Sequence, residues 1–110
     1  MLPKLFRLSK KSDFDTVFKQ GRRKALRYFF VQWLKNEKNH PRIGIIISNK
    51  VSKKATLRNK IKRRIREIVW NMLPSLGSTD VIILAKTGSV NIPYNAIQQD
   101  LENILYIIKK

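Results

Sequence analysis

The residues between 56 and 73 place the strongest constraint on how this chain can fold. At the spacing of an α-helix they separate into two stripes. One stripe is aliphatic and consists of Leu57, Ile61, Ile65, Ile68 and Val69. The other is polar and mostly basic and consists of Arg58, Asn59, Lys62, Arg63 and Arg66. We therefore predict a helix with one face in a core and the other face available to a partner.

The available face of this helix is strongly positive. Every charged residue from Lys50 to Arg66 is Lys or Arg, and the whole chain has a formal net charge of +17. Such charge repels itself, whereas a polyphosphate neutralises it and releases bound counterions. A solvated charged face usually mixes signs at i, i+4 spacing, but Glu67 is the only acid in this helix. The composition favours a nucleic acid as the partner.

Several other classes of protein are excluded or disfavoured. The chain has no Cys and one His, His40 in a polar loop, so disulfides, zinc knuckles and thiolate catalysis are excluded. The acids are scattered and there is no Walker-type phosphate loop, which predicts a binding protein and not a stand-alone enzyme. An anionic membrane surface could use the same charge, but no window approaches the roughly 18 apolar residues of a membrane span. We expect a cytoplasmic protein.

Hydrophobic spacing before the basic helix predicts one helix and two strands. Ser12 and Asp15 resemble a capping box, and the apolar positions that follow predict a short helix that ends at Gly21. Residues 27–34 and 43–48 are rich in aromatic and β-branched side chains. We predict that they form two strands, paired antiparallel.

After the basic helix, one strand and one helix are expected. Pro74 and Gly77 should end the basic helix, residues 80–86 read as a buried strand, and the apolar spacing from Tyr94 onward predicts a last helix. The order is α, β, β, α, β, α, and one more strand could lie in the loops. With no repeat and no Gly/Ser linker, residues 1–110 form a single domain.

Aromatic residues offer a second way to bind nucleic acid, because unpaired bases stack on ring faces while cations hold the backbone. Alternation along the first strand places Tyr28, Phe30 and Gln32 on one face. The other face holds Phe29, Val31 and Trp33. Only one of these faces need be core, although core packing is the commoner role of any single aromatic residue. The candidates for stacking are Phe14, Phe18, Tyr28, Phe30 and Trp33.

Residues 55–67, ATLRNKIKRRIRE, resemble the basic signature A-x-x-R-N-x-x-K-R-x-x-R-E of the bacterial ribonuclease P protein component family. The flanking segments RIGIIISNKVSKK and FDTVFKQGRR are also similar to the family, so the resemblance spans nearly the whole chain. It implies an α+β fold, a two-layer α/β sandwich with a four-stranded sheet in the order α-β-β-(β)-α-β-α. It also implies that the basic helix lies in an uncommon left-handed β-α-β crossover.

The same resemblance implies the protein subunit of a ribonucleoprotein endoribonuclease. In this family a large RNA uses Mg²⁺ to remove the 5′ leader of precursor tRNA, and the protein assists it. The Mg²⁺ would be bound mainly by that RNA, with no cofactor intrinsic to the protein. The expected partners are ribonuclease P RNA and precursor tRNA, without a membrane or a small-molecule substrate. One alternative is a ribosomal protein or general RNA chaperone. Another is a protein that is itself a nuclease, which is motivated only by the expected association with RNA cleavage.

The resemblance also assigns residues to two binding surfaces. It implies no catalytic residue and no metal ligand in the protein. The contacts to the catalytic RNA would be Lys50, Lys53, Lys54, Arg58, Asn59, Lys62, Arg63 and Arg66. The cleft for the single-stranded leader would be lined by Phe14, Phe18, Tyr28, Phe30 and Gln32.

Overall fold

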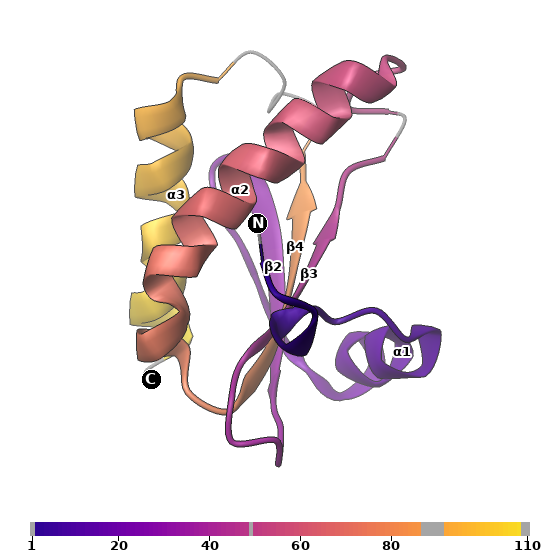
Figure 1. Ribbon diagram of the computed structural model, residues 1–110, viewed down its shortest axis with the longest axis vertical. Helices are drawn as coiled ribbons and strands as arrows, with labels where there is room; N and C mark the ends of the chain where they lie inside the picture. Colours follow the sequence, from indigo (N-terminus) through magenta and orange to yellow (C-terminus); the bar gives the residue numbers. More distant parts are fainter. Residues whose placement is uncertain (1, 49, 87–91, 109–110) are drawn as a thin grey trace.

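A computed structural model of the chain describes residues 2–48, 50–86 and 92–108 (Figure 1). The predicted α+β order is confirmed, and the additional strand is β1, in the basic segment after the first helix. In chain order the elements are η1 (Lys4–Phe6), α1 (Lys11–Gln20), β1 (Arg22–Ala25), β2 (Phe29–Lys35), β3 (Arg42–Ile46), α2 (Ala55–Leu76), β4 (Thr79–Ala85) and α3 (Tyr94–Ile108).

The four strands form one mixed sheet in the order β1-β2-β4-β3. Strand β2 is antiparallel to both β1 and β4, whereas β3 is parallel to β4. The predicted antiparallel pair of residues 27–34 with 43–48 is therefore wrong, because β4 lies between these strands. The reason is burial: Val81, Ile82 and Ile83 of β4 are at most 1% exposed, so this strand needs cover on both faces and both edges.

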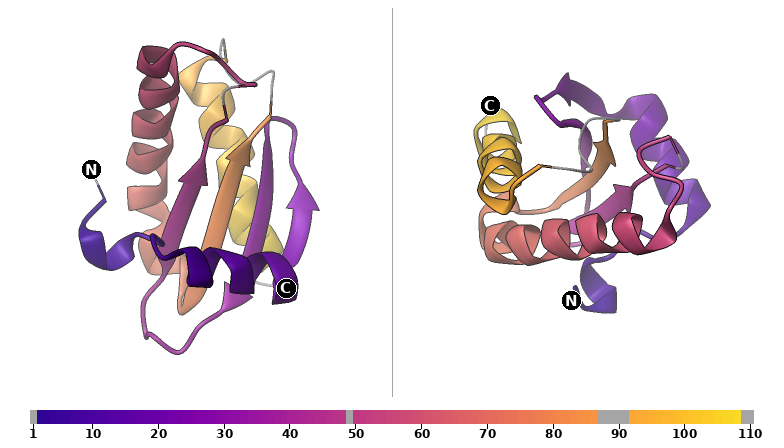
Figure 2. Two further views of the ribbon diagram at one scale, coloured as in Figure 1. Left: turned by 90° about the vertical axis from the view of Figure 1, so that its right-hand side faces the viewer. Right: turned by 90° about the horizontal axis from the view of Figure 1, so that it is seen from above.

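Helix α2 connects the parallel strands β3 and β4 by a left-handed crossover. In Figure 1 both strands run upward, α2 lies on the viewer's side of them, and β4 lies to the left of β3. The view from above in Figure 2 also places α2 on that side. The expected handedness is confirmed, in contrast to the right-handed connections of most β-α-β units.

The sheet separates two cores. On one face α2 and α3 pack against β2 and β4, and this larger core includes Phe29, Val31 and Trp33, which share a face as alternation predicted. Trp33, a candidate for base stacking, is therefore a core residue. On the other face α1 lies across the strands (Figure 2), where Leu8, Val17 and Ile82 are buried. The sheet is therefore covered by α2 and α3 on one face and by α1 on the other.

Two predicted helix ends are wrong. Helix α1 begins at Lys11, so Ser12 is inside it, and the cap residue Lys10 makes no side-chain capping bond. The predicted capping box is absent because Ser12 is already in the first turn, where its carbonyl accepts a hydrogen bond from Thr16 Oγ1 at 2.9 Å. Helix α2 continues through Pro74, because a proline in the last turn removes few intrahelical bonds and buried Leu76 anchors that turn. Gly77, at a φ of 64°, follows as the cap residue.

Candidate nucleic-acid interface

The first half of α2 presents the predicted contacts to the catalytic RNA. Asn59 and Arg63 are exposed, whereas Arg58, Lys62 and Arg66 are half-buried along the flank of the helix. Buried Ile61 and Ile65 fix the helix to the larger core, which orients the basic flank outward. We call the eight predicted residues the basic face: Lys50, Lys53, Lys54, Arg58, Asn59, Lys62, Arg63 and Arg66.

Arg58 joins the helical part of the basic face to the loop before it. Its Nη1 donates a hydrogen bond to the Ser52 carbonyl at 2.8 Å. The loop residues Lys50, Lys53 and Lys54 are exposed. The structure therefore brings the loop cations and the helix cations together, and Arg58 has a structural role beside any contact with a partner.

The positive charge of the basic face is not neutralised within the described part of the chain. Both ion pairs found there belong to Arg42, with Asp13 and with Asp80. Cations at i, i+3 and i+4 spacing repel one another unless counterions or a polyanion approach them. The arrangement suits a chain of phosphates.

The face of the sheet that carries α1 holds most of the predicted leader contacts. The rings of Phe14 and Phe18 lie 6.4 Å apart between centroids, and both pack against the smaller core. Phe30 is 47% exposed, and the Lys86 ammonium lies 4.6 Å from its ring centroid. Exposed rings beside cations are what single-stranded nucleic acids use for stacking and backbone contact.

A hollow of about 480 Å³ lies along β1 and β2 next to Phe30. Arg23 and Lys24 of β1 contribute cations to its lining, and Gln32 contributes its amide. The Oε1 of Gln32 is buried and accepts no hydrogen bond from the described residues. A buried acceptor without a donor carries a free-energy penalty. Phe14 and Phe18 lie on the same face of the sheet but do not line the hollow. We call the hollow and these two rings together the sheet cleft.

Tyr28 does not lie with Phe30 and Gln32. Its side chain packs against the larger core, its backbone N–H donates to Asp100 Oδ2 at 2.9 Å, and the Arg27 guanidinium lies 5.2 Å from its ring centroid. The predicted placement of Tyr28 on the same face is wrong, because this residue precedes β2 and sits in a turn, where strand alternation does not apply.

Sequence reasoning did not identify Arg42. This residue begins β3, bonds Asp80 at the start of β4, and reaches Asp13 on α1. The hydrogen bond with Asp80 is the main cause that raises the pKa of Arg42 above its ordinary value, against the opposing effect of burial. The available signal was a pair of opposite charges at the starts of two predicted strands.

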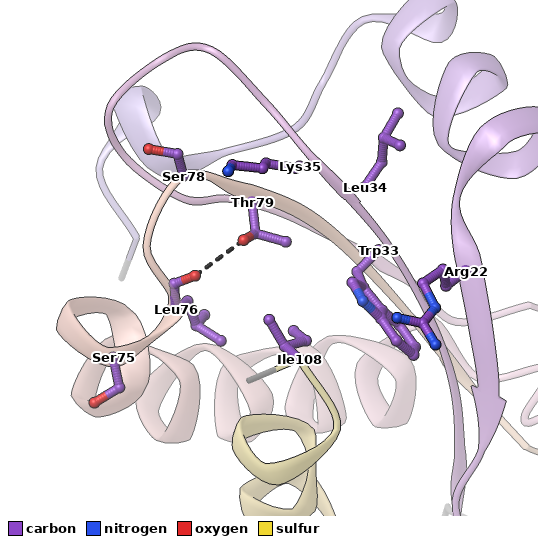
Figure 3. A pocket seen from close by; sticks show the side chains of 9 residues that line it. All are labelled: Arg22, Trp33, Leu34, Lys35, Ser75, Leu76, Ser78, Thr79 and Ile108. Carbon is purple, nitrogen blue, oxygen red and sulfur yellow. Dashed lines mark hydrogen bonds between the residues drawn. The ribbon is translucent and has the colours of Figure 1, made fainter. Parts of the chain in front are cut away.

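A second hollow that sequence reasoning missed lies at the C-terminal end of α2 (Figure 3). Its volume is about 550 Å³, and its lining includes Trp33, Lys35 and Arg22, whose guanidinium carbon lies 5.9 Å from the Trp33 ring centroid. Thr79 Oγ1 donates to the Leu76 carbonyl at 2.9 Å and closes one side. The basic face occupies the other half of α2, so this hollow is not part of it.

Two features are absent from residues 2–48, 50–86 and 92–108. No group of three or more His, Cys, Asp or Glu side chains is placed to hold a metal ion there. Within the same ranges, no helix has the length and apolar character needed to cross a membrane.

The fold and these surfaces define a small, strongly basic α+β protein, with cations concentrated on one helix and aromatic side chains on the opposite side of its sheet. Its sequence matches the family Ribonuclease P over residues 2–109. The chain belongs to the ribonuclease P protein family.

Similar proteins support this assignment in sequence and in structure. The ribonuclease P protein component of Streptococcus pneumoniae (strain Hungary19A-6) is 38% identical over 109 residues, which are 98% of this chain and 88% of the relative. A Staphylococcus aureus RNase P protein mutant with defective mRNA degradation activity matches with a TM-score of 0.89 and 36% identity, over 96% of this chain and 90% of the other. The RNase P protein of Thermotoga maritima matches with a TM-score of 0.84 and 30% identity, over 93% and 96%. The chain is thus a protein component of ribonuclease P, a subunit of an endoribonuclease.

Proposed function

We propose that this protein binds the catalytic RNA of ribonuclease P and the 5′ leader of precursor tRNA, and so assists endonucleolytic removal of the leader. The observation that carries the proposal is the basic face of α2, whose cations have no carboxylate partner among the described residues. Phosphate contacts supply affinity without demanding a particular sequence. A structured RNA is the partner that this face fits.

The sheet cleft supports the proposed contact with the leader. It lies on the α1 side of the sheet, whereas α2 packs with α3 on the other side, so two RNA segments can bind at once. Stacking on Phe14, Phe18 or Phe30 tolerates different bases. Arg23 and Lys24 beside the hollow can hold the phosphates of the strand whose bases stack. This combination suits leaders of varied sequence.

We assign the chemistry to the RNA, with Mg²⁺ held mainly by that RNA, and we place the protein in the cytoplasm. Three of the acids have structural partners: Asp13 and Asp80 bind Arg42, and Asp100 accepts the backbone N–H groups of Arg27 and Tyr28. These carboxylates are occupied in holding the fold together. The role left for the protein is to bind and position RNA.

The test is 5′-leader release from precursor tRNA at low Mg²⁺ with a bacterial ribonuclease P RNA, with and without this protein. Faster release that requires both components is the expected result. Binding of precursor tRNA without faster release would overturn the proposal and favour a general RNA chaperone. The protein without RNA is a third arm, in which sustained cleavage would show that the protein itself is a nuclease.

A further inference from the structure

Trp70 continues the basic face of α2 but is not one of its predicted contacts. Asn59, Arg63, Arg66 and Trp70 are separated by four, three and four residues, which places them in one row on the helix surface. Trp70 is 48% exposed, although an indole is among the costliest side chains to leave in water. An exposed aromatic ring therefore stands at the end of a row that carries two arginines.

The N-terminal segment holds Trp70 in place from one side. Phe6 of η1 packs edge-on against the indole, with 6.3 Å between ring centroids and 76° between ring planes. His40 in turn packs edge-on against Phe6, at 5.7 Å and 86°. These contacts orient the indole while about half of its surface stays in solvent. The ring is supported before any partner arrives, which lowers the entropy lost on binding.

The neighbours of Trp70, and not its exposure alone, indicate the kind of partner. Tyr106 on α3 is more exposed, at 73%, but it lines a hollow with Glu102, whose charge disfavours RNA. Trp70 follows Arg66 by one turn, and exposed Lys4 lies in the same short helix as Phe6; one acid, Glu67, is also near the ring, three positions before it. Cations flanking an accessible ring are typical of surfaces that bind unpaired nucleotides.

We propose that Trp70 stacks on an unpaired base of the RNA bound along the basic face. This inference rests on the proposed function, because it requires that α2 binds RNA. Trp70 lies about 10 Å along the helix axis from Arg63, given the rise of an α-helix. Phosphates held by Arg63 and Arg66 would thus place a neighbouring base over the indole. The interface would extend from the loop at Lys50 to the N-terminal segment.

The two tryptophans of this chain allow a direct test by fluorescence. Trp33 is 8% exposed and Trp70 is 48% exposed, so stacking should quench only Trp70. We expect a short oligoadenylate to quench the emission of the wild-type protein, and an abasic strand of equal length to bind with little quenching. In Trp70→Phe the quenching should disappear. Equal quenching in wild type and Trp70→Phe would overturn the inference.

Affinity for labelled ribonuclease P RNA provides the second readout, because a short single strand could also bind in the sheet cleft. Trp70→Ala should weaken binding about 5- to 100-fold, as expected for loss of one stacked base. Trp70→Phe should retain most of the affinity, since it keeps a ring against Phe6. Tyr106→Ala is the matched control, an exposed aromatic outside the basic face, and should bind as wild type.

The outcomes separate this inference from the function on which it rests. If Trp70→Ala binds RNA with the affinity and salt dependence of the wild type, the proposed role of Trp70 is wrong. The proposed binding of RNA by the basic face would be unaffected. Absence of RNA binding by the wild type would overturn the proposed function itself. If Trp70→Ala does not fold, the quenching titration of the wild type and of Trp70→Phe still tests whether Trp70 stacks on a base.

Discussion

Arg42 and Asp80 are paired in register across the parallel strands β3 and β4, and two hydrogen bonds join their side chains. Nε donates to Oδ1 at 2.8 Å and Nη2 donates to Oδ2 at 2.6 Å. The remaining Nη1 of Arg42 donates to Asp13 on α1 at 3.1 Å. Arg42 thereby fastens the helix that carries Phe14 and Phe18 to the sheet.

The raised pKa of Arg42 determines how the contribution of its guanidinium depends on pH. A pKa that is higher in the folded state stabilises the fold below the unfolded-state pKa, and this stabilisation is lost only as pH rises through the folded-state value. The ordinary pKa of arginine already lies far above neutral pH. The contribution of the guanidinium is therefore constant across the pH range in which an RNA complex would be studied.

Arg42→Ala should lower the free energy of unfolding by about 3–5 kcal/mol, because it leaves the carboxylate of Asp80 buried without its charged partner. The side chain of Asp80 is 8% exposed and that of Asp13 is 29% exposed. Asp13→Ala should therefore cost less than about 1 kcal/mol. Urea denaturation measures both. Equal losses for the two variants would contradict the ranking.

Arg63→Ala and Arg66→Ala should each flatten the salt dependence of binding to the catalytic RNA. The slope of log affinity against log salt should decrease in magnitude by about 0.7 to 0.9 for each phosphate that the variant no longer neutralises. Arg58→Ala should also loosen the loop that it bonds at Ser52. Lys35→Ala, an exposed cation beside the C-terminal end of α2, is the control. An unchanged slope would place Arg63 and Arg66 outside the interface.

Phe18→Ala should weaken binding of precursor tRNA to the complex of protein and catalytic RNA, and leave binding of mature tRNA unchanged. Loss of one stacked base corresponds to about 1–3 kcal/mol. Phe18 is only partly buried, so the fold should persist, which circular dichroism checks. Thr16→Ala, exposed on the same helix, serves as the control. Equal weakening for both tRNAs would argue against a leader contact.

Gly44→Ala should disturb the sheet cleft from beneath. A Cβ at Gly44 would lie 2.6 Å from Cε1 and Cζ of Phe14, so the ring would have to move off β3. Overpacking of this kind costs about 1–3 kcal/mol. In a double-mutant cycle, Phe14→Leu should relieve part of that loss. Strict additivity of the two changes would show that the ring and the glycine do not compete for space.

The sequence predicted the elements whose patterns are local. Helical spacing separated the basic face from the buried face of α2, and alternation placed Phe29, Val31 and Trp33 together on one face of β2, which the structure shows to be the core face. Strand β1 could not be predicted in this way, because all of its residues are exposed and its identity as a strand comes from pairing with β2.

The features that sequence reasoning missed depend on contacts between distant residues. The partners Arg42 and Asp80 are 38 positions apart, and their opposite charges indicate a pair only once their strands are known to be neighbours. The position of β4 between β2 and β3 has the same origin, since neighbours along the chain need not be neighbours in the sheet. Helical spacing alone places Trp70 on the polar row of α2, but its exposure and its support by Phe6, 64 positions away, are visible only in the structure.

The two outer strands of the sheet differ in how they resist pairing with another copy of the protein. Edge β1 carries Arg22, Arg23 and Lys24, whose mutual repulsion opposes edge-to-edge aggregation. Edge β3 is instead covered by the chain, where the Leu8 N–H donates to the Ile43 carbonyl at 2.9 Å. The N-terminal segment thus shields the edge of β3 while it supports Trp70. Removing it would expose strand hydrogen-bonding groups and promote self-association before any RNA is bound.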